Sequence, residues 1–346
     1  MDTLTHALTG TAIYGAWTVM TDPALLHTPV AAGVLVAAIL GSEAPDLDYV
    51  VKLKNGPIAY LRQHRGPSHG IPFWLIWPLV LATGIYLFVP NHFSLFFVVS
   101  GIAVLTHVFM DIFNTFGTRA LWPFYKSRIA LDTIFVTDFV WLLLAIIGLV
   151  GVATGWPVRR TIIDFTIAAA VYLAWRGLVS IQLRLQMRKH YPKAAWRVSV
   201  LPRPLPWWWS FVAESSEQVI VGQVTLQGQI RPEIRWRKAN FTSDLARFVF
   251  EQTDLGASFR TFARHLLWTQ SHDGEVIRVS MADAIYRYQK TFPFSAFVTV
   301  KQNEKGYELV EESLRGQAID LKALFAEAAD AKPGSTSEIR FPNADT

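Results

Sequence analysis

The chain has 346 residues, of which 51% are hydrophobic and 17% are charged, whereas about 25% are charged in ordinary soluble domains. Together with a mean hydropathy of +0.27, this composition argues against an ordinary soluble protein and favours several membrane helices. The absence of cysteine excludes disulfides, thiolate zinc sites and iron–sulfur clusters, and basic cytoplasmic loops explain the net charge of +5, so we expect no nucleic-acid partner.

Membrane helices are predicted in the first half of the chain. Residues 7–20 and 30–40 are short apolar stretches, each of which either crosses the membrane or forms half of a re-entrant hairpin. The stretches 70–89, 93–109 and 139–156 contain no charged residue, and 163–183 contains only Asp164 and Arg176. Since a crossing helix needs about 20 apolar residues, we predict an α-helical integral membrane domain with about four to six membrane helices.

The basic residues predict how this domain is oriented. Lys and Arg are concentrated in segments 41–70, 113–138 and 184–197, which lie on one side if the helices alternate, whereas the opposite loops carry only Arg159 and Arg160. The positive-inside rule places these segments, the N-terminus and the C-terminal half in the cytoplasm. The N-terminus lacks the basic region of a signal peptide, so we expect the first helix to be retained. The expected location is the cytoplasmic (inner) membrane of a bacterium or archaeon, as a multi-pass protein.

The composition changes after residue 190. Residues 201–206 are rich in proline, and we interpret the following Trp207, Trp208 and Trp209 as an interfacial anchor rather than an aromatic ligand platform. Segments 217–230, 275–279 and 294–300 alternate apolar and polar residues, which is typical of half-buried strands. We predict a membrane-embedded hydrolase domain at 1–190, a Pro- and Trp-rich linker at 191–210, and a small soluble, cytoplasmic β-rich domain at 211–346, closed by a helix at 320–331 and a disordered tail.

Histidine and aspartate residues gather at the predicted membrane borders of the first half. The predicted topology places all of them on the cytoplasmic side, although the orientation was assigned from Lys and Arg alone. Such nitrogen- and oxygen-rich groups are typical of metal sites. The candidates are His6, Asp46, Asp48, His64, His69, His107 and Asp111.

Local spacing supports some of these candidates. His107 and Asp111 are four residues apart on one helix, so both side chains can reach one ion, although a proton relay or a structural hydrogen bond would use the same spacing. His6 follows Thr5, which we expect to cap the first helix, and a lone His6 is also compatible with a surface position. Asp48 is equally compatible with a solvated or capping carboxylate.

Several short motifs occur together in this chain. They are Met1 to His6, the Pro-Asp-Leu-Asp segment 45–48, the His-Arg-Gly-Pro-Ser-His segment 64–69, the His-x-x-x-Asp segment 107–111, and segments 114–117 and 132–138. With them the sequence resembles the YdjM-like family of membrane-bound metal-dependent hydrolases, more weakly so in 201–209 and the C-terminal domain. One departure is Gly70, where family members commonly have Ser. The resemblance implies a metal-dependent hydrolase.

The order of the candidate ligands also resembles that of zinc-dependent phospholipase C and its nuclease relatives. Those proteins are helical enzymes that cleave phosphoesters with clustered zinc ions. The similarity implies metal ligation by His6, Asp46, His69, His107 and Asp111. The later His and His-x-x-x-Glu of that group have no counterpart in this chain, so we expect one or two divalent ions, zinc or manganese, rather than three.

We therefore predict metal-assisted hydrolysis of a phosphoester, such as a lipid, at the cytoplasmic membrane face. Asp48 and His64 are predicted as further ligands or as proton-transfer groups. Arg65 either holds a substrate phosphate or is a positive-inside charge. Asp138 either orients a ligand histidine or is a helix-start carboxylate.

Two other functions use the same features. A metal or proton transporter would need ionisable groups near the membrane midplane and a path to both sides, whereas here the groups gather at one face. A non-catalytic membrane scaffold would bind a partner through its β-rich domain. If that domain supplied a metal ligand, His265 and His272 would be the candidates. The partners that we expect are the lipid bilayer and a phosphoester or lipid substrate, and the oligomeric state stays open.

Overall fold

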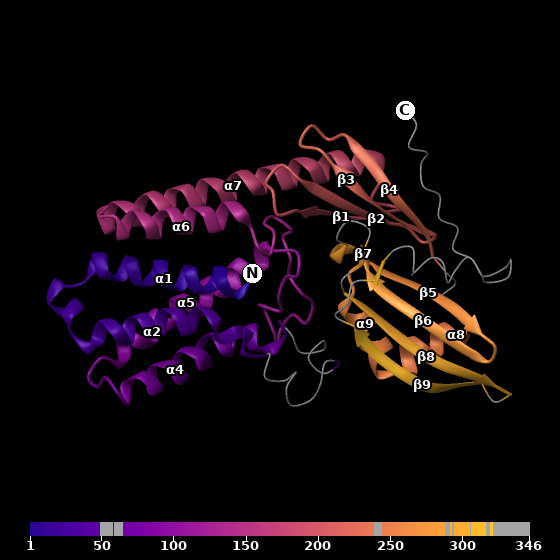
Figure 1. Cartoon of the computed structure of the whole chain (residues 1–346), viewed down its shortest axis with the longest axis horizontal. Helices are drawn as coiled ribbons and strands as arrows, with labels where there is room; N and C mark the ends of the chain where they lie inside the picture. The colour runs from indigo at the N-terminus through magenta and orange to yellow at the C-terminus, as the bar shows by residue number, and fades with distance from the viewer. Residues whose placement is uncertain are drawn as a thin grey trace. The chain divides into compact units, whose positions relative to one another are not determined.

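The computed structural model describes residues 1–48, 58, 65–238, 244–287, 291–292, 294–304, 306–315 and 319–320. The described chain divides into two compact units. The first comprises residues 1–48, 65–182 and 201–208, and the second comprises residue 58, residues 183–200 and the described residues from 209 onwards. The first unit is helical and the second contains the sheets (Figure 1).

Apolar helices make up the first unit. They are α1 (Thr3–Met20), α2 (Pro29–Glu43), α4 (Phe73–Tyr86), α5 (Phe93–Phe113), α6 (Phe139–Ala153) and α7 (Val158–His190), joined in part by the short helices η1 (Pro23–His27), η2 (Ala44–Asp48) and η3 (Pro67–His69). The last part of α7, residues 183–190, belongs to the second unit. Among the described residues, three segments are long and apolar enough to cross a membrane: 29–47, 93–113 and 158–190. The predicted count of four to six is not confirmed, because α4 and α6 are shorter apolar helices of 14 and 15 residues.

Side-chain caps determine where two of these helices begin. Asp2 caps α1 by accepting a hydrogen bond from the Thr5 backbone N–H, and Thr5 lies buried within the helix. The prediction that Thr5 caps α1 is therefore wrong, because the helix begins two residues earlier. Asp138 caps α6 by accepting from the backbone N–H groups of Val140 and Trp141. It also accepts a hydrogen bond from the Tyr172 hydroxyl, so the helix-start interpretation of Asp138 is the one that the structure supports.

Close helix packing brings α2 against α5. The buried residues between α2, α4 and α5 include Val34, Ala38, Ala82 and Phe96. At Gly41 the backbones approach so closely that an added Cβ would lie 2.8 Å from the Ser100 carbonyl oxygen. Small residues permit such approaches between membrane helices. The C-terminal end of α2 is thereby held beside the C-terminal half of α5.

The second unit contains two four-stranded antiparallel sheets. Strand order in the first sheet is β1 (Arg197–Pro202), β2 (Trp209–Glu214), β3 (Gln218–Val224), β4 (Ile230–Arg237), and in the second it is β5 (Leu266–Asp273), β6 (Val276–Asp283), β8 (Ser295–Asn303), β9 (Gly306–Arg315). The short strands β7 (Thr291–Phe292) and β10 (Ile319–Asp320) pair separately. The strands predicted around 217–230, 275–279 and 294–300 correspond to β3, β6 and β8, so the prediction of a β-rich C-terminal half is confirmed.

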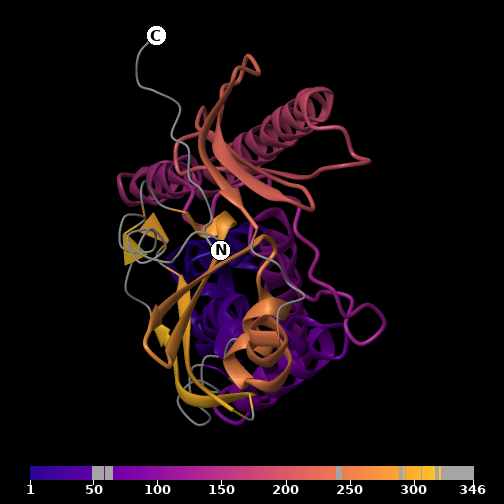
Figure 2. The ribbon, with the colours of Figure 1, turned by 90° about the vertical axis from the view of Figure 1, so that its right-hand side faces the viewer.

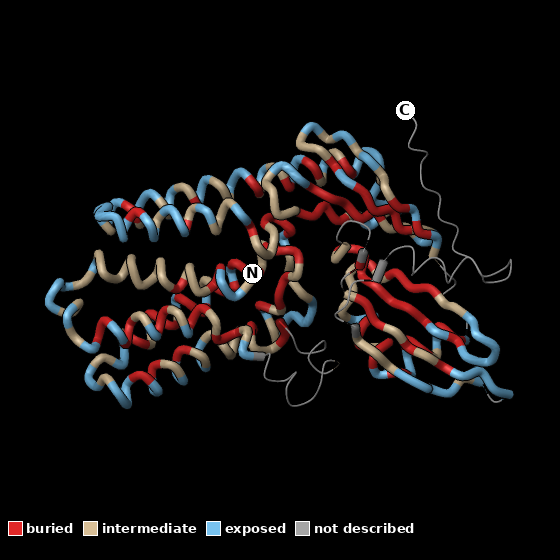
Figure 3. The backbone as a smooth tube through the Cα atoms, viewed as in Figure 1, coloured by how far each residue is buried: buried red, intermediate tan, exposed pale blue. Residues whose placement is uncertain are grey.

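Short helices cover one face of the second sheet (Figure 2). They are α8 (Asp244–Arg247), the π-helical turn η4 (Phe248–Gln252) and α9 (Asp254–Phe262). Their apolar side chains, such as Val249 and Phe259, pack against Val279 and Val298 of the sheet. This burial forms the core of the second unit, which Figure 3 shows as buried stretches along the strands.

The segment around residues 191–210 is more structured than a linker pattern indicates. It contains β1, and Trp209 begins β2 with only 2% of its surface exposed. Trp209 is therefore a core residue rather than part of an interfacial anchor, whereas Trp207 and Trp208 are 54% and 55% exposed. Of the predicted closing helix at 320–331, residue 320 lies in β10, and the remainder and the tail lie outside the described residues.

Candidate metal centre

Four His and Asp side chains converge at one end of the first unit. Asp46 comes from η2, His69 from η3, and His107 and Asp111 from α5. One ligand atom from each lies within 4.8 Å of the other three. The side chains of His69, His107 and Asp111 are fully buried, and that of Asp46 is 20% exposed. Segments more than 60 residues apart in the sequence thus meet at one point.

The distances between these atoms resemble the edges of a tetrahedron. The Nε2 atoms of His69 and His107 are 3.3 Å apart. His69 Nε2 lies 3.4 Å from Asp46 Oδ1 and 3.5 Å from Asp111 Oδ2. The corresponding distances from His107 Nε2 are 3.8 and 3.7 Å. Ligands bound tetrahedrally at about 2.0–2.2 Å are separated by roughly 3.3–3.6 Å, so the arrangement fits one tetrahedral ion such as zinc.

The orientation of His107 leaves a lone pair directed at the other ligand atoms. Its Nδ1 lies 2.6 Å from the carbonyl oxygen of Ser42, at the end of α2. Because a carbonyl oxygen only accepts hydrogen bonds, Nδ1 carries the proton, and in the neutral ring Nε2 is unprotonated. Histidine ligands in metal sites are commonly oriented by such a bond from their other nitrogen. The Nδ1 of His69 similarly lies 3.0 Å from the Ser68 hydroxyl.

Two carboxylate oxygens in the cluster are buried without a hydrogen-bond donor. In the described part of the chain, no group donates a hydrogen bond with acceptable geometry to Asp46 Oδ1 or Asp111 Oδ2. These oxygens are the same atoms that face His69 and His107. A buried unsatisfied carboxylate is costly, and a bound cation removes that cost. The donor set and its unsatisfied atoms therefore fit a divalent metal ion.

The other oxygen of Asp111 is held by the protein itself. The N-terminal amine of Met1 contacts Asp111 Oδ1, and the side-chain amide of Asn114 donates to it at 2.9 Å. His6 Nε2 and Arg65 Nη2 each lie 3.4 Å from the same oxygen. Asp111 thus has one oxygen fixed by donors and one directed into the cluster. This asymmetry orients the carboxylate for a ligand role.

Arg65 lies inside the site rather than on a loop surface. Its side chain is 5% exposed, with Nη1 3.1 Å from Asn114 Oδ1 and Nη2 3.2 Å from the Met1 carbonyl oxygen. The guanidinium also lies over the ring of Phe116, 5.0 Å from its centroid. The two interpretations of Arg65, as a group that holds a substrate phosphate or as a positive-inside charge, stay predictions, but its side chain is buried beside Asp111.

His6 is next to the four-residue cluster but is not one of its members. Its ring stacks on that of His107 with centroids 3.7 Å apart, and its Nε2 lies 2.8 Å from the Met1 amine. Its Nδ1 is buried and makes no hydrogen bond within the described residues. Of the other predicted residues, the Asp48 side chain and all of His64 lie outside the described residues.

Two residues that contact Asp111 were not among the predicted site residues. Asn114 accepts from the backbone N–H groups of Phe116 and Gly117 while it donates to Asp111, so it connects the end of α5 to the cluster. Its position three residues after Asp111 was the available signal. Met1 is the other, and nothing in its residue type indicates a place in such a site.

Electrostatics around His69 favour a positive charge in the cluster. Burial disfavours the protonated ring, but the contacts with Asp111 and Asp46 outweigh burial and raise the pKa of His69 above its usual value. The same two carboxylates would stabilise a metal cation, which would replace the proton on His69.

The C-terminal histidines are not among the four residues of the cluster. Within the second unit, His265 is fully buried, with Nδ1 2.6 Å from Glu214 Oε2 and Nε2 2.8 Å from the Ser199 hydroxyl. His272 is exposed on β5. Neither belongs to the group of potential ligands found among the described residues.

A helical unit with candidate membrane spans and a buried His/Asp cluster at one end defines an integral membrane protein with a candidate metal centre. The sequence pattern of the YdjM inner membrane proteins matches residues 1–182, more than half of the chain, and the chain belongs to this family. The matched segment contains the whole cluster. Uncharacterized protein YfhP of Bacillus subtilis (strain 168) is 28% identical over 327 residues, which cover 91% of this chain and 98% of that protein. No solved structure matches the chain.

Proposed function

We propose that the protein is a metal-dependent hydrolase that cleaves a phosphoester at the membrane surface. The observation that carries the proposal is the cluster of His69, His107, Asp46 and Asp111, whose four facing atoms have tetrahedral spacings and two of whose oxygens lack a donor. Two imidazoles and two carboxylates are suitable zinc ligands, and the five distances of 3.3–3.8 Å that involve the two histidines are compatible with zinc. One ion accounts for these four atoms.

A divalent ion held by these residues would supply Lewis acidity, and because the four side chains already complete a tetrahedral shell, it would need a fifth coordination position to bind a water molecule and lower its pKa. The residues of the chain supply the remaining functions. Asp46 is the most exposed of the four side chains, so the substrate approaches from its side. Arg65 places a permanent positive charge 3.4 Å from Asp111 Oδ1, where it attracts the phosphate group of a substrate.

His6 is proposed as a group that acts beside the ion. It stacks on His107 and has a buried nitrogen without a hydrogen-bond partner in the described chain. These features suit either proton transfer to the substrate or ligation of a second ion. Asp48 and His64 keep their predicted roles as further ligands or proton-transfer groups.

The proposed location is the cytoplasmic face of the inner membrane. The concentration of Lys and Arg in the segments that contain η2, η3 and the α5–α6 connection supports it. The cluster lies at the ends of helices rather than midway along them, which favours an enzyme over a transporter.

The experiment is a metal analysis of the purified protein in detergent, followed by hydrolysis assays with bis(p-nitrophenyl) phosphate and with phospholipids in mixed micelles. We expect about one zinc ion per chain, release of p-nitrophenol, loss of the activity on chelation and its recovery with zinc. A metal-loaded protein that hydrolyses no phosphoester but moves the ion across proteoliposome membranes would replace the hydrolase with a transporter.

A further inference from the structure

The loop between α5 and α6 exposes a group of large apolar side chains. Its neck is closed by Thr118 and Ile129, which exchange two backbone hydrogen bonds of 3.1 and 2.9 Å. The exposed apolar side chains lie in the tip between them and are Leu121, Phe124 and Tyr125, of which Phe124 is 83% exposed. Neighbouring apolar side chains that a fold leaves uncovered mark a surface that contacts a partner or a membrane.

Backbone hydrogen bonds attach this loop to the segment that leads into α4. The Arg119 N–H donates to the Arg65 carbonyl oxygen at 3.1 Å, and the Ile71 N–H donates to the Trp122 carbonyl oxygen at 3.0 Å. The approach is close, because a Cβ added at Gly70 would lie 2.8 Å from the same Trp122 oxygen. The loop is therefore fixed beside the residues that immediately precede α4.

The first two turns of α4 mark the level of the membrane interface. α4 packs against α5, which is long and apolar enough to cross a membrane, and it exposes Leu75 and Leu79. Its first two turns contain Trp74 and Trp77, whose indole N–H groups donate to backbone carbonyl oxygens of η3. Tryptophan is enriched where acyl chains meet headgroups. Because the loop is bonded just before these turns, it lies at the same boundary.

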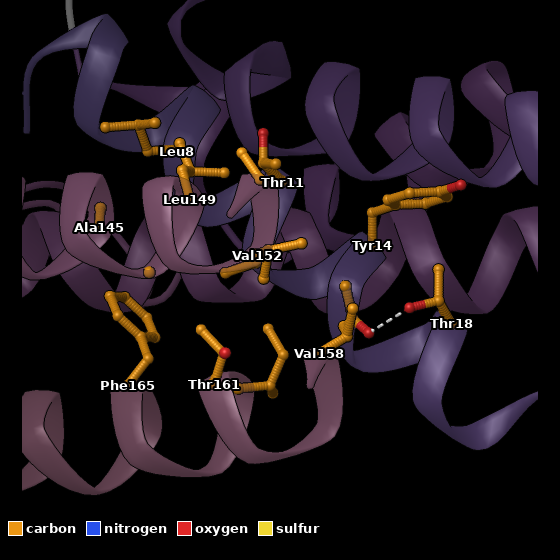
Figure 4. A pocket seen from close by; sticks show the side chains of 15 residues that line it. Leu8, Thr11, Tyr14, Thr18, Ala145, Leu149, Val152, Val158, Thr161 and Phe165 are labelled. Carbon is orange, nitrogen blue, oxygen red and sulfur yellow. Dashed lines mark hydrogen bonds between the residues drawn. The ribbon is translucent and has the colours of Figure 1, made fainter. Parts of the chain in front are cut away.

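Away from this boundary the helical unit presents apolar side chains, as an acyl-chain environment requires. Figure 4 shows a pocket between α1, α6 and α7 that is lined by residues such as Leu8, Leu149 and Phe165, and none of its lining residues is charged. The tip of the α5–α6 loop differs, because its aromatic residues are followed by Lys126 and Arg128. Aromatic side chains next to basic ones suit the headgroup layer of an anionic membrane rather than its interior.

We propose that residues 121–126 enter the headgroup layer of the membrane and bind anionic phospholipid headgroups. Phe124 and Tyr125 lie among the headgroups and the upper acyl chains, and Lys126 contacts lipid phosphates. Lysine is depleted in protein–protein interfaces, so its place beside the exposed aromatic residues favours a lipid surface over a second protein. The proposal does not rest on the proposed hydrolase activity, because it concerns only where the loop lies and what it contacts.

The absence of cysteine permits a direct measurement of the depth of the loop. Phe124→Cys introduces a single thiol for a nitroxide spin label in the full chain, reconstituted in vesicles of phosphatidylethanolamine and phosphatidylglycerol. Leu79→Cys on α4 provides the reference among the acyl chains, and Asp244→Cys, at an exposed position of the second unit, provides the reference in water. Oxygen concentrates in the bilayer and a nickel chelate stays in water, so the collision rates of the label with both reagents measure its depth.

We expect the label at Phe124→Cys to collide more often with oxygen than with the nickel chelate, at a depth between the two references. Lys126→Gln should lower the ratio of inserted to non-inserted label about fivefold, since this is the effect of one elementary charge near an anionic membrane surface. Phosphatidylcholine in place of phosphatidylglycerol should lower the ratio further. Arg159→Gln, which removes an exposed charge at the start of α7, is the matched control and should leave the ratio unchanged.

Three results would count against the proposal. A label at Phe124→Cys that is as accessible to the nickel chelate as the label at Asp244→Cys would place the loop in water and overturn it. An immobile label that neither reagent reaches would show that protein covers the loop, and would overturn it as well. A depth that neither Lys126→Gln nor phosphatidylcholine changes would reject the binding of anionic headgroups.

Discussion

Gly41 of α2 lies against the backbone of Ser100 of α5, so closely that a Cβ at Gly41 would be 2.8 Å from the Ser100 carbonyl oxygen. The same Cβ would also be 2.8 Å from the Ala103 Cβ. The next residue, Ser42, provides the carbonyl oxygen that orients His107. The distance between these helices therefore controls the position of a candidate metal ligand.

Gly41→Ala should weaken both the fold and the cluster. Neither the Ser100 carbonyl nor Ala103 can move independently of α5, so α2 must shift, and overpacking of this kind costs about 1–3 kcal/mol. We expect a lower unfolding temperature and a reduced metal content per folded protein. Gly84→Ala, where nothing lies within 4 Å, is the control and should change neither. If the Gly41→Ala protein is destabilised but binds a normal amount of metal, the packing of α2 on α5 does not control the position of His107.

The location of the second unit is predicted by the basic residues in the loops. A green fluorescent protein fused to the C-terminus of the full chain should fluoresce, and an alkaline phosphatase fused at the same position should be inactive, because each folds on only one side of the membrane. The opposite pair of results would place the C-terminal half, and with it the His/Asp cluster, on the other side. As a control, replacing Arg159 and Arg160 by Gln removes the basic residues of the opposite loops and should leave both fusion results unchanged.

Local sequence patterns predicted the elements better than the contacts between them. The spacing of His107 and Asp111 indicated a shared helix face, and alternation indicated β3, β6 and β8. Which apolar stretches cross the membrane was harder to predict, because the helices α4 and α6 are only 14 and 15 residues long. A segment of three tryptophans does not reveal that a strand begins at the third.

The different contacts of the two carboxylate oxygens of Asp111 could not be predicted from the neighbouring sequence. Its Oδ1 is held by Met1, 110 residues away, and by Arg65 and Asn114, whereas its Oδ2 faces the histidines. Such contacts depend on how the helices pack against one another. The spacing of residues in a single sequence does not predict that packing. For the same reason the sequence could not separate His6, which stacks beside the cluster, from the residues within it.

Arg65→Lys should impair phosphoester hydrolysis while the protein keeps its metal. Lysine preserves the charge but cannot bridge Asn114 and Met1 with two nitrogens, and the loss of a hydrogen bond to a charged group costs about 1.5–3 kcal/mol. We expect kcat/KM to fall by about 10- to 100-fold, mainly through KM. The control is Arg160→Lys, at an exposed ion pair with Asp164. Loss of metal in Arg65→Lys would instead assign Arg65 to holding Asp111.

Acid should destabilise the second unit through Glu214. Its carboxylate contacts His265 Nδ1 and Lys238 Nζ, both at 2.6 Å. Burial alone would raise the pKa of Glu214, but these hydrogen bonds outweigh it and hold the pKa at about 2 instead of 4.5. These hydrogen bonds therefore stabilise the folded state while Glu214 is ionised. Because the pKa is lower in the folded state, this stabilisation is complete above pH 4.5 and is lost as the pH falls towards 2.

Glu214→Gln tests this linkage. The variant should unfold at a lower temperature than the wild type at pH 7, and the difference should shrink as the pH is lowered from 5 to 3. Thermal unfolding of the full chain in detergent, followed by tryptophan fluorescence, measures both proteins. Glu217→Gln, at an exposed position, is the control. An unfolding difference that does not depend on pH would show that Glu214 acts by packing rather than by its charge.

The sharpest prediction concerns His107 and Asp111, one turn apart on α5 with facing atoms 3.7 Å apart. His107→Ala and Asp111→Asn should each lower the bound metal and abolish hydrolysis, because the remaining ligands would have to hold an incomplete shell. Asp111→Asn is the more informative variant, since it keeps the shape of the side chain and changes its charge. Thr106→Ala is the control, because that hydroxyl bonds only within its own helix, at Ile102. Metal per folded chain is measured for all variants, with folding checked by thermal unfolding. Full metal occupancy in both ligand variants would remove this pair from the metal centre and leave it as a proton relay within the membrane helix.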